Sequence, residues 1–334
     1  MTDAALPLVD VGAALRGYDP AARRAAGRRI DAACREIGFF CVVGHDVPAE
    51  LVAGMRLISR AFFDRPLAEK LSVKVDPQPG AAGYMAMGEH ALAQTHGETR
   101  APDLNELMTI GPVDVPDAPY FRSEAAQRWF VRNKFPERPP EFRATWCAYY
   151  RAMSAFGNQL MRLAALGLGL PETWFDDKLD RQISRLAVRE YPLQHEALLP
   201  GQLRAAAHTD FGALTLLMPE DKPGGLQICS RDGDWLDVRA PAGVYVVNIG
   251  DMMAQWTNHA WVSTLHRVAN PPDGADPGAR RQSLVFFQIP NFDAAIDCIP
   301  TCADAANPPR HAPIAAGEYY LAKVAQMRKA APAP

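Results

Sequence analysis

Residues 205–217 read "AAAHTDFGALTLL" and place a histidine and an aspartate two residues apart, just before an apolar run typical of a sheet core. In an extended strand successive side chains point to opposite faces, so His208 and Asp210 would share one face and Thr209 would point away. The stretch therefore predicts two potential metal ligands that face one point. Such a pair alone is weak support, because the chain has eight histidines and chance produces one His-x-Asp pair at about even odds.

The C-terminal half continues the strand pattern of this stretch. After about residue 180, short β-rich runs alternate with Gly, Pro and Asp turns: "RLAVREYP", "ALTLLM", "LQICS", "WLDV", "VYVVNIG", "STLHRVA" and "SLVFFQIP". Many short strands separated in this way are typical of a β-sandwich or jelly roll. The sequence thus predicts a β core after residue 180.

The N-terminal region mixes helices with one buried strand. Apolar residues every three to four positions predict a helix from Asp19 to Ile37, which Gly38 ends. "FFCVVGH" (39–45) predicts a buried strand, and "AELVAGMRLISRAFFDRP" (49–66) predicts another helix. The start of the chain is therefore expected to combine both kinds of element.

A long scaffold helix is expected in the middle of the chain, where an apolar stripe runs from Phe142 to Leu163 and ends at "GLGLP". Before it, residues 76–140 carry many prolines and glycines. We expect long ordered loops with little regular structure there.

Composition and charge limit the classes of partner. The chain has 334 residues, 48% hydrophobic and 22% charged, with a net charge of −3, and no dense basic run with interleaved aromatics that would follow a phosphate backbone. No secretory leader and no apolar run near the roughly 18 residues of a membrane span are visible. We expect a soluble cytoplasmic protein with reduced cysteines and a small-molecule substrate, without nucleic-acid or membrane partners; the oligomeric state is open.

A second histidine in another β-like run completes a metal constellation. His266 lies in "STLHRVAN", and a jelly roll can bring such strands together across its mouth. Two imidazoles and one carboxylate leave half of an octahedral ion open, which suits a non-haem Fe(II) that binds oxygen and a co-substrate together. Structural zinc would require four protein ligands, usually with Cys, and none is placed for it. The other histidines are expected in turns, surface or core: His45, His90, His96, His195, His259 and His311.

A candidate anion clamp follows in "RRQSLVFF" (280–287). Arg281 and Ser283 are two apart on a predicted strand and so share a face. A guanidinium with a hydroxyl beside it can hold a carboxylate, as at the far end of a diacid. The alternative is a surface arginine with a salt-bridge partner.

Taken together, these segments resemble the isopenicillin N synthase-like family of Fe(II)/2-oxoglutarate-dependent dioxygenases, from about residue 6 to 328. The matching segments include "LPLVDV", "GFFCVVGHDVP", "AFFDRPLAEKL", "PDLNELMTIG", "HTDFGALTLL", "GGLQI", "VVNIGDMMAQWTN", "STLHRV", "RQS" and "GEYYLAKV". The resemblance implies an α+β protein whose core is a double-stranded β-helix (jelly roll, cupin-like), flanked by N-terminal helices and a C-terminal helix. Within one compact unit we expect an N-terminal helix and strand region (1–110), linking loops with the scaffold helix (111–180) and the jelly-roll core (181–330).

The resemblance also implies a reaction and its residues. His208, Asp210 and His266 would be the catalytic Fe(II) ligands, Arg281 and Ser283 would bind the distal carboxylate of 2-oxoglutarate, and Tyr191 in "REYP" would line the co-substrate end. Dioxygen and 2-oxoglutarate would be consumed, succinate and carbon dioxide released, and an unactivated C–H bond of a secondary metabolite hydroxylated, desaturated or closed into a ring.

Two residues are candidates for substrate contact. Alternation along the strand sends Arg189 inward with Tyr191, at a position where the family carries Asn or an apolar residue, so it would meet a substrate carboxylate or phosphate; an ordinary ion pair is the alternative. Phe287 shares the face of Arg281 and would line either the substrate pocket or plain sheet core. Residues 83–106 resemble a loop that covers substrate, and the turn-rich connection 267–280 is expected to extend away from the site.

Three other functions compete with this interpretation. An oxidase like isopenicillin N synthase would use no 2-oxoglutarate, and its "RQS" would hold a substrate carboxylate. The loop after Gly83 weakly suggests ethylene formation from 2-oxoglutarate. A non-enzymatic sensor of a small acid or metal is less favoured, because the triad and the clamp are both intact.

Overall fold

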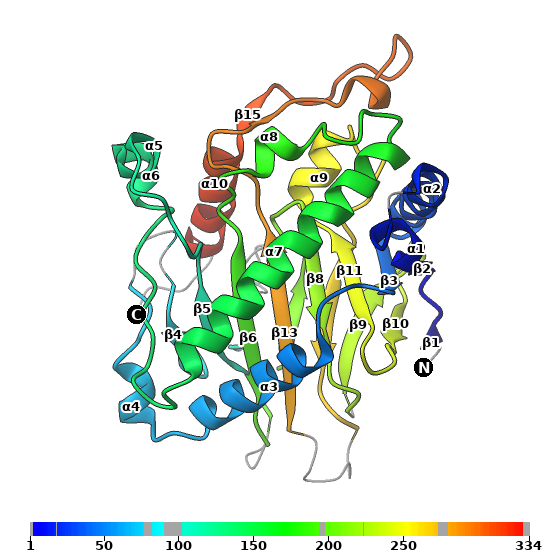
Figure 1. Ribbon diagram of the computed structural model, residues 1–334. Coiled ribbons are helices and arrows are strands. Elements are labelled where there is room, and N and C mark those ends of the chain that lie inside the picture. Colours follow the sequence, from blue (N-terminus) through cyan, green and yellow to red (C-terminus); the bar gives the residue numbers. More distant parts are fainter. Residues whose placement is uncertain are drawn as a thin grey trace.

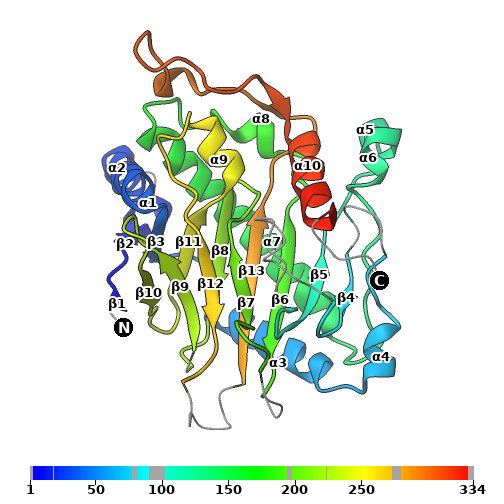
Figure 2. The same cartoon turned by 180° about the vertical axis from the view of Figure 1, so that it is seen from behind.

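The computed structural model describes residues 3–17, 19–76, 80, 82–89, 102–193, 198–222, 224–272 and 280–329. Within these residues the strands form a two-layered jelly roll (Figure 1). The larger sheet has the order β2-β3-β11-β8-β13-β6-β5-β4, and the smaller has the order β1-β10-β9-β12-β7. Figure 2 shows the smaller sheet in front of the larger one. The predicted jelly-roll core is confirmed.

The core strands coincide with the β-rich runs of the sequence. They are β6 (Arg185–Tyr191), β7 (Ala205–His208), β8 (Leu214–Met218), β9 (Gly225–Cys229), β10 (Trp235–Val238), β11 (Tyr245–Ile249), β12 (His266–Ala269) and β13 (Arg281–Gln288). N-terminal strands extend both sheets: β1 (Asp3–Ala4), β2 (Leu8–Asp10), β3 (Phe39–Val43), β4 (Tyr84–Met85) and β5 (Glu106–Ile110). A small hairpin of β14 (Ala295–Ile296) and β15 (Ile314–Ala315) follows.

Strand β5 corrects the expectation of little regular structure in residues 76–140. Its five residues pair with β6 along their whole length, and β4 pairs in turn with β5. The short run "ELMTI" carries little signal by itself, since its stability comes from pairing with a strand about eighty residues later. This addition matters for function because it widens the inner wall of the jelly roll.

Helices cover the outer face of the larger sheet, as Figure 1 shows. The long helix α7 (Phe142–Gly167) crosses β6, β13 and β8, with α2 (Pro20–Glu36) and α3 (Ala49–Phe63) beside it. Asp19 caps α2 by accepting a 2.9 Å hydrogen bond from the Ala21 amide. The predicted helices are confirmed, and none of the described helices is long and apolar enough to cross a membrane.

The remaining helices are short, except at the C-terminus. They are α1 (Gly12–Leu15), α4 (Leu67–Leu71), α5 (Pro119–Arg122), α6 (Glu124–Gln127), α8 (Asp176–Leu179), α9 (Asp251–Trp256), the 3₁₀ turn η2 (Pro300–Cys302) and α10 (Ala316–Lys329). Helix α10 confirms the predicted C-terminal helix. It lies near the upper end of β13 and β6 (Figure 2).

Strand β6 is buried on both faces, yet the two faces differ in chemistry. Leu186 and Val188 pack with α7 in the main apolar core. The alternate residues Arg185, Arg189 and Tyr191 point between the sheets. Two buried arginines on an inner face are costly to desolvate. The space that they line is therefore a candidate ligand site.

Candidate metal centre and the adjoining pocket

His208, Asp210 and His266 converge at the open end of the jelly roll. One potential ligand atom from each lies within 4.8 Å of the others. His208 Nε2 is 3.9 Å from Asp210 Oδ1, and His266 Nε2 is 3.6 Å from Asp210 Oδ2. All three side chains are buried. Among the described residues they form the one His/Cys/Asp/Glu group of this kind.

The two histidines come from neighbouring strands of the smaller sheet. His208 ends β7 and His266 begins β12, and the two residues are Cα partners. Each ring donates through Nδ1 to a backbone carbonyl two residues earlier, at 2.7 Å to Ala206 and at 3.0 Å to Thr264. These bonds leave both Nε2 lone pairs turned toward Asp210, as a metal ligand requires.

Asp210 lies beside the two histidines, but not because a strand continues through it. The expectation of a strand running through Asp210 is wrong, because β7 ends at His208. The Asp210 carbonyl instead accepts a 2.7 Å bond from the Asp251 amide. Its carboxylate Oδ2 accepts bonds from Thr215 Oγ1 at 2.6 Å and Asn248 Nδ2 at 2.8 Å, so the larger sheet holds it in place.

The protonation states at pH 7 suit a divalent cation. Burial, followed by the proximity of His266, lowers the pKa of His208 to about 3, so this imidazole is neutral. Burial opposes ionisation of Asp210, but the two imidazoles and the bonds from Asn248 and Thr215 hold its pKa below the usual value. Two imidazoles and one carboxylate on one side of a site fit Fe(II) with open positions.

Cross-strand rows on the inner face of the larger sheet organise the rest of the site. The first row is Asn248, Thr215, Phe287 and Arg185. A lower row contains Ser283, Arg189, Leu107 and Met85, and the lowest pairs Arg281 with Tyr191. The three candidate metal ligands therefore lie above one end of the first row, and Ser283 and Arg281 lie two and three rows below.

Arg281, Ser283 and Tyr191 form the closed end of the site. All three are buried, and Arg281 Nη1 donates to the carbonyls of Lys222 and Gly224 at 3.2 and 3.0 Å. Arg281 Nε is buried without a hydrogen-bond partner in the described structure. A small cavity of about 50 Å³ adjoins Ser283 and Tyr191 and reaches His208, Asp210 and His266. Arg281 is the Cα partner of Tyr191, which lines this cavity, and its unpaired donor would suit a carboxylate such as the distal one of 2-oxoglutarate.

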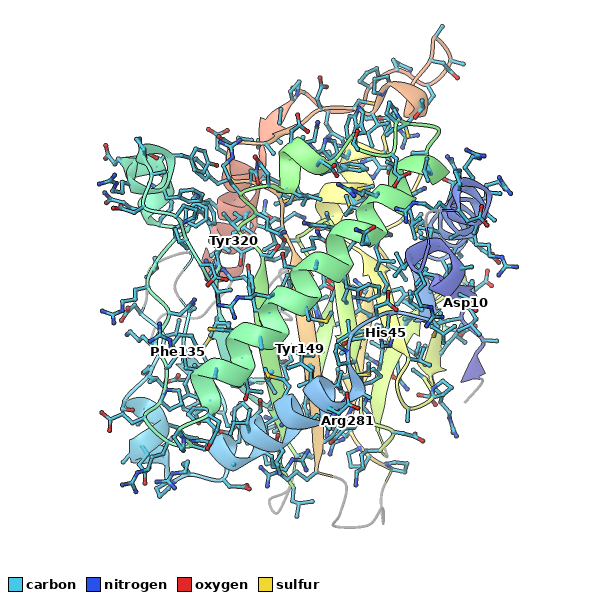
Figure 3. The ribbon with its side chains drawn as sticks, viewed as in Figure 1. Asp10, His45, Phe135, Tyr149, Arg281 and Tyr320 are labelled. Carbon is cyan, nitrogen blue, oxygen red and sulfur yellow. The ribbon has the colours of Figure 1, made fainter. Side chains whose placement is uncertain are left out.

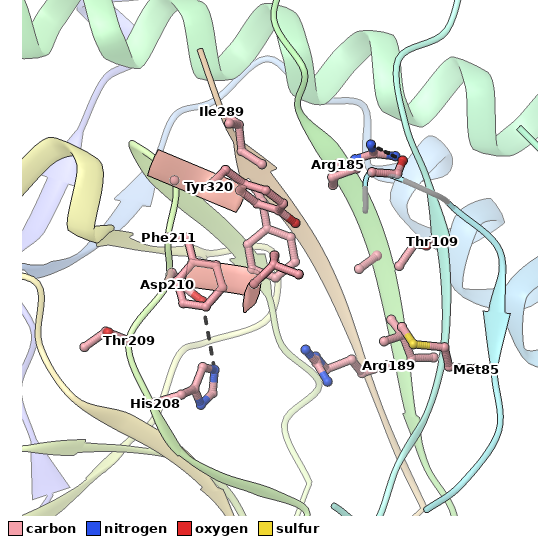
Figure 4. Close-up of a pocket in the computed structure, with 16 residues that line it drawn as sticks. Met85, Thr109, Arg185, Arg189, His208, Thr209, Asp210, Phe211, Ile289 and Tyr320 are labelled. Atoms are coloured by element: carbon pink, nitrogen blue, oxygen red, sulfur yellow. Dashed lines mark hydrogen bonds and ion pairs between the residues drawn. The ribbon is translucent and has the colours of Figure 1, made fainter. Parts of the chain in front are cut away.

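A larger cavity of about 270 Å³ opens on the other side of the metal ligands. Its walls include His208, Asp210, Phe287 and Arg189, and Figure 4 shows Arg189 between His208 and Met85. Phe287 and Arg189 line both cavities. Arg189 donates a 3.2 Å bond to Asn105 Oδ1, and no ion pair of Arg189 is found among the described residues.

Two features of this pocket escaped sequence reasoning. Arg185 lines the pocket on the same strand face as Arg189 (Figure 4), and the alternation that turned Arg189 inward would have found it. Asp251 is the second: its carboxylate accepts bonds from Ser263 Oγ at 2.7 Å, Thr209 Oγ1 at 3.2 Å and Lys323 Nζ at 2.7 Å. Asp251 thereby joins helix α10 to the segment between His208 and Asp210, a link without a sequence signal.

Several predicted features lie partly or wholly outside the described residues. The central part of 83–106 and half of 267–280 fall there, as do His90, His96 and His195. His45 contacts the Gly243 carbonyl at 2.9 Å, and His259 contacts His311 at 2.7 Å. None of these three lines the two cavities described above.

Comparison with known protein families finds two matches, one in each half of the chain. Residues 6–138 match the N-terminal family described as non-haem dioxygenase in morphine synthesis. Residues 182–290 match the 2OG-Fe(II) oxygenase superfamily, and this range contains the complete triad and clamp.

Similar proteins of known name cover nearly the whole chain. The chain is 33% identical to validamycin A dioxygenase of Streptomyces hygroscopicus subsp. limoneus, over 96% of this chain and 86% of that protein. It is 31% identical to a homoarginine-6-hydroxylase of Oryza sativa subsp. japonica, over 88% and 87% of the two chains. The crystal structure of a full-length Neurospora crassa protein in complex with alpha-KG superposes with a TM-score of 0.83 at 29% identity, covering 96% of each chain. This chain therefore belongs to the 2OG-Fe(II) oxygenase superfamily, and it is an Fe(II)- and 2-oxoglutarate-dependent dioxygenase.

Proposed function

We propose that His208, Asp210 and His266 hold the catalytic Fe(II), and that Arg281, Ser283 and Tyr191 form the 2-oxoglutarate site. When bound, the ferrous ion and its co-substrate supply oxidation: for hydroxylation, R–H, dioxygen and 2-oxoglutarate give R–OH, succinate and carbon dioxide. Desaturation and ring closure are the other outcomes of this chemistry. The protein holds both molecules in register and excludes bulk water from the buried triad.

The observation that carries this proposal is the position of the triad between two cavities. His208 and Asp210 line both the small cavity beside Ser283 and the larger one beside Arg185. One cavity would accept the co-substrate and the other a primary substrate, so that a C–H bond faces the metal from the side of Phe287. The co-substrate and the primary substrate would thus approach the metal centre from different cavities.

We propose that Arg189 and Phe287 contact the primary substrate. Arg189 is nine-tenths buried and offers guanidinium donors beyond its single bond to Asn105. Phe287 is partly buried at the boundary of both cavities. The aromatic ring would orient an apolar part of the substrate, while Arg189 would bind an acceptor oxygen near the metal.

The test is succinate formation by the purified protein with Fe(II), 2-oxoglutarate and oxygen, before and after addition of candidate substrates. We expect succinate and oxygen uptake to require both Fe(II) and 2-oxoglutarate. Turnover of a substrate without 2-oxoglutarate would contradict the proposal and favour an oxidase like isopenicillin N synthase. Ethylene in the headspace would identify the ethylene-forming alternative.

We also propose a cytoplasmic location and a role in secondary metabolism. The six cysteines are unpaired in the structure, as expected for a reducing compartment. Segments 1–110, 111–180 and 181–330 would act as one unit, since strands from the first and third share both sheets. Fractionation of the native cells with a cytoplasmic marker tests the location.

A further inference from the structure

Arg185 is a buried cation at the end of the pocket away from the co-substrate clamp. It is 9% exposed and shares a cross-strand row with Thr215 and Phe287. Thr215 holds the carboxylate of Asp210, so the metal site and Arg185 lie at opposite ends of one row. With two strand spacings between them, the Cα atoms of Thr215 and Arg185 are roughly 10 Å apart.

Among the residues that the structure describes, none supplies an acidic partner for Arg185. Its one hydrogen bond among the described residues goes from Nη2 to the Gly80 carbonyl, and no ion pair to Arg185 is found in that part of the chain. Asp210 is the one acidic residue among the described pocket walls, and a metal would use its charge. A buried guanidinium with free donors and no carboxylate is costly unless a ligand supplies an anion.

The Arg185 guanidinium packs closely against Gly111, where an added Cβ would lie 2.5 Å from Arg185 Nη1. Thr109 and Tyr320, two residues with hydroxyl groups, line the same cavity as Arg185. The Thr109 hydroxyl also bonds to the Gly83 backbone. Met85, Leu107 and Val324 supply apolar walls. Hydroxyls beside a guanidinium bind oxyanions, and the apolar walls fit a carbon skeleton.

2-Oxoglutarate cannot be the ligand of Arg185 while it occupies the clamp. Arg281 is the Cα partner of Tyr191, six residues beyond Arg185 on β6, which corresponds to roughly 20 Å along the strand. In Figure 3, Arg281 lies in the lower part of the molecule, and Tyr320, a pocket neighbour of Arg185, lies well above it. This separation far exceeds the length of a five-carbon diacid, so Arg185 serves a second molecule.

We propose that Arg185 binds an anionic group, a carboxylate or a phosphate, of the primary substrate and thereby presents the other end of that molecule to the metal centre. The inference rests on the proposed function and adds the substrate class to it. Arg189 differs from Arg185 because it lines both cavities, whereas Arg185 lines the substrate cavity alone. A substrate whose charged groups are all cationic would meet two guanidiniums and is disfavoured by charge repulsion.

The experiment compares matched anionic and neutral compounds. Succinate formation is measured with a panel of carboxylic acids and phosphate monoesters, and with the primary amides of the acids and the parent alcohols of the esters. We expect acids or phosphate esters to stimulate 2-oxoglutarate turnover and to raise the Tm of the protein. Amides and alcohols should do neither. A response to the carboxylic acids identifies the anion as a carboxylate, and a response to the phosphate monoesters identifies it as a phosphate.

Variants then assign the effect to Arg185. Arg185→Gln should lower kcat/KM for the stimulating anion roughly 10- to 100-fold through its KM, since a charge-assisted hydrogen bond is lost. Arg185→Lys should recover part of the loss. Arg122→Gln, on an arginine whose side chain is 64% exposed, is the matched control and should behave as the wild type. Tm and 2-oxoglutarate binding report on folding in each case.

The outcomes separate this inference from the proposed function. If the wild type binds no 2-oxoglutarate and forms no succinate, the proposed function fails. If it does both, but neutral analogues stimulate as well as their anions, Arg185 is not an anion site. The same conclusion follows if no anion in the panel stimulates turnover or if a folded Arg185→Gln variant keeps the wild-type KM.

Discussion

The two ends of the β6–β13 pair carry buried arginines that look alike but are held differently. At the lower end, Arg281 is fixed by two backbone carbonyls, and its strand partner Tyr191 lines a cavity of about 50 Å³. At the upper end, Arg185 lines a cavity of about 270 Å³, and the Gly80 carbonyl is its single hydrogen-bond partner within the described part of the chain. In the proposed function, the narrow lower end would select one small diacid, whereas the wider upper end would allow variation in the substrate. Co-substrate and substrate recognition would thus be separated along one strand pair.

The largest expected effect comes from the metal ligands, which both ends share. Asp210→Ala or His266→Ala should reduce 2-oxoglutarate turnover to below about one thousandth, because the metal loses a ligand and chemistry at either end stops. Metal content and succinate are the measurements. His311→Ala, a control outside both cavities, should retain activity. A folded Asp210→Ala variant with full activity would disprove the metal assignment.

The next effect distinguishes the lower end from the upper. Arg281→Gln should raise KM for 2-oxoglutarate roughly 10- to 100-fold, because the distal carboxylate loses a charged donor. The KM for the primary substrate should change little, the reverse of the expectation for Arg185→Gln. Steady-state kinetics with each reactant varied in turn measures both constants. If Arg281→Gln raised the KM of the primary substrate alone, the lower end would bind the primary substrate instead of 2-oxoglutarate.

A smaller effect tests how the lower end holds Arg281. Gly225 has φ +152, and an added Cβ would lie 2.8 Å from Arg281 Nη1. Gly225→Ala should weaken 2-oxoglutarate binding about fivefold, as backbone strain of about 1 kcal/mol and the displaced guanidinium combine. Gly233 also has a positive φ, +90, without any neighbour within 4 Å, so Gly233→Ala controls for backbone strain without the contact. Equal losses of 2-oxoglutarate binding in both variants would show that backbone strain, and not the contact with Arg281, causes the effect.

The smallest effect concerns helix α10, which lies near the upper end of the β6–β13 pair. Lys323→Met removes the ion pair with Asp251, which ties α10 to the segment carrying His208 and Asp210. We expect a loss of at most about 1 kcal/mol in stability and a modest rise in substrate KM, because Tyr320 and Val324 of the same helix line the pocket. Thermal unfolding and KM measure these changes. A changed KM for 2-oxoglutarate, with the substrate KM intact, would show that α10 serves the lower end.

The contrast between the two ends also explains what the sequence could predict. Arg281 and Ser283 stand two apart within one strand, and His266 begins another β-rich run, so local patterns located them. Asp210 was placed correctly by a wrong route, since contacts with Asn248 and Asp251, rather than a continuous strand, bring it to the histidines. Local spacing was sufficient for the metal and the co-substrate end.

The upper end depends on segments that only tertiary structure brings together. Its wall includes β5, whose five residues carry little strand signal, and its cover is α10, which is tied to Asp251 across 72 positions. Arg185 was within reach of the alternation argument that found Arg189, yet its missing acidic partner became visible only from the contacts around it. Substrate recognition could therefore not be predicted from local spacing.

The most direct test of the central claim is an anaerobic titration of the purified protein with Fe(II) in the presence of 2-oxoglutarate, followed by visible absorption and metal analysis. We predict one Fe(II) bound per chain and a charge-transfer absorption that requires both Fe(II) and 2-oxoglutarate. Both signals should be lost in folded His208→Ala and His266→Ala variants. A wild-type protein that takes up no Fe(II), or variants that bind it as well as the wild type, would contradict the account.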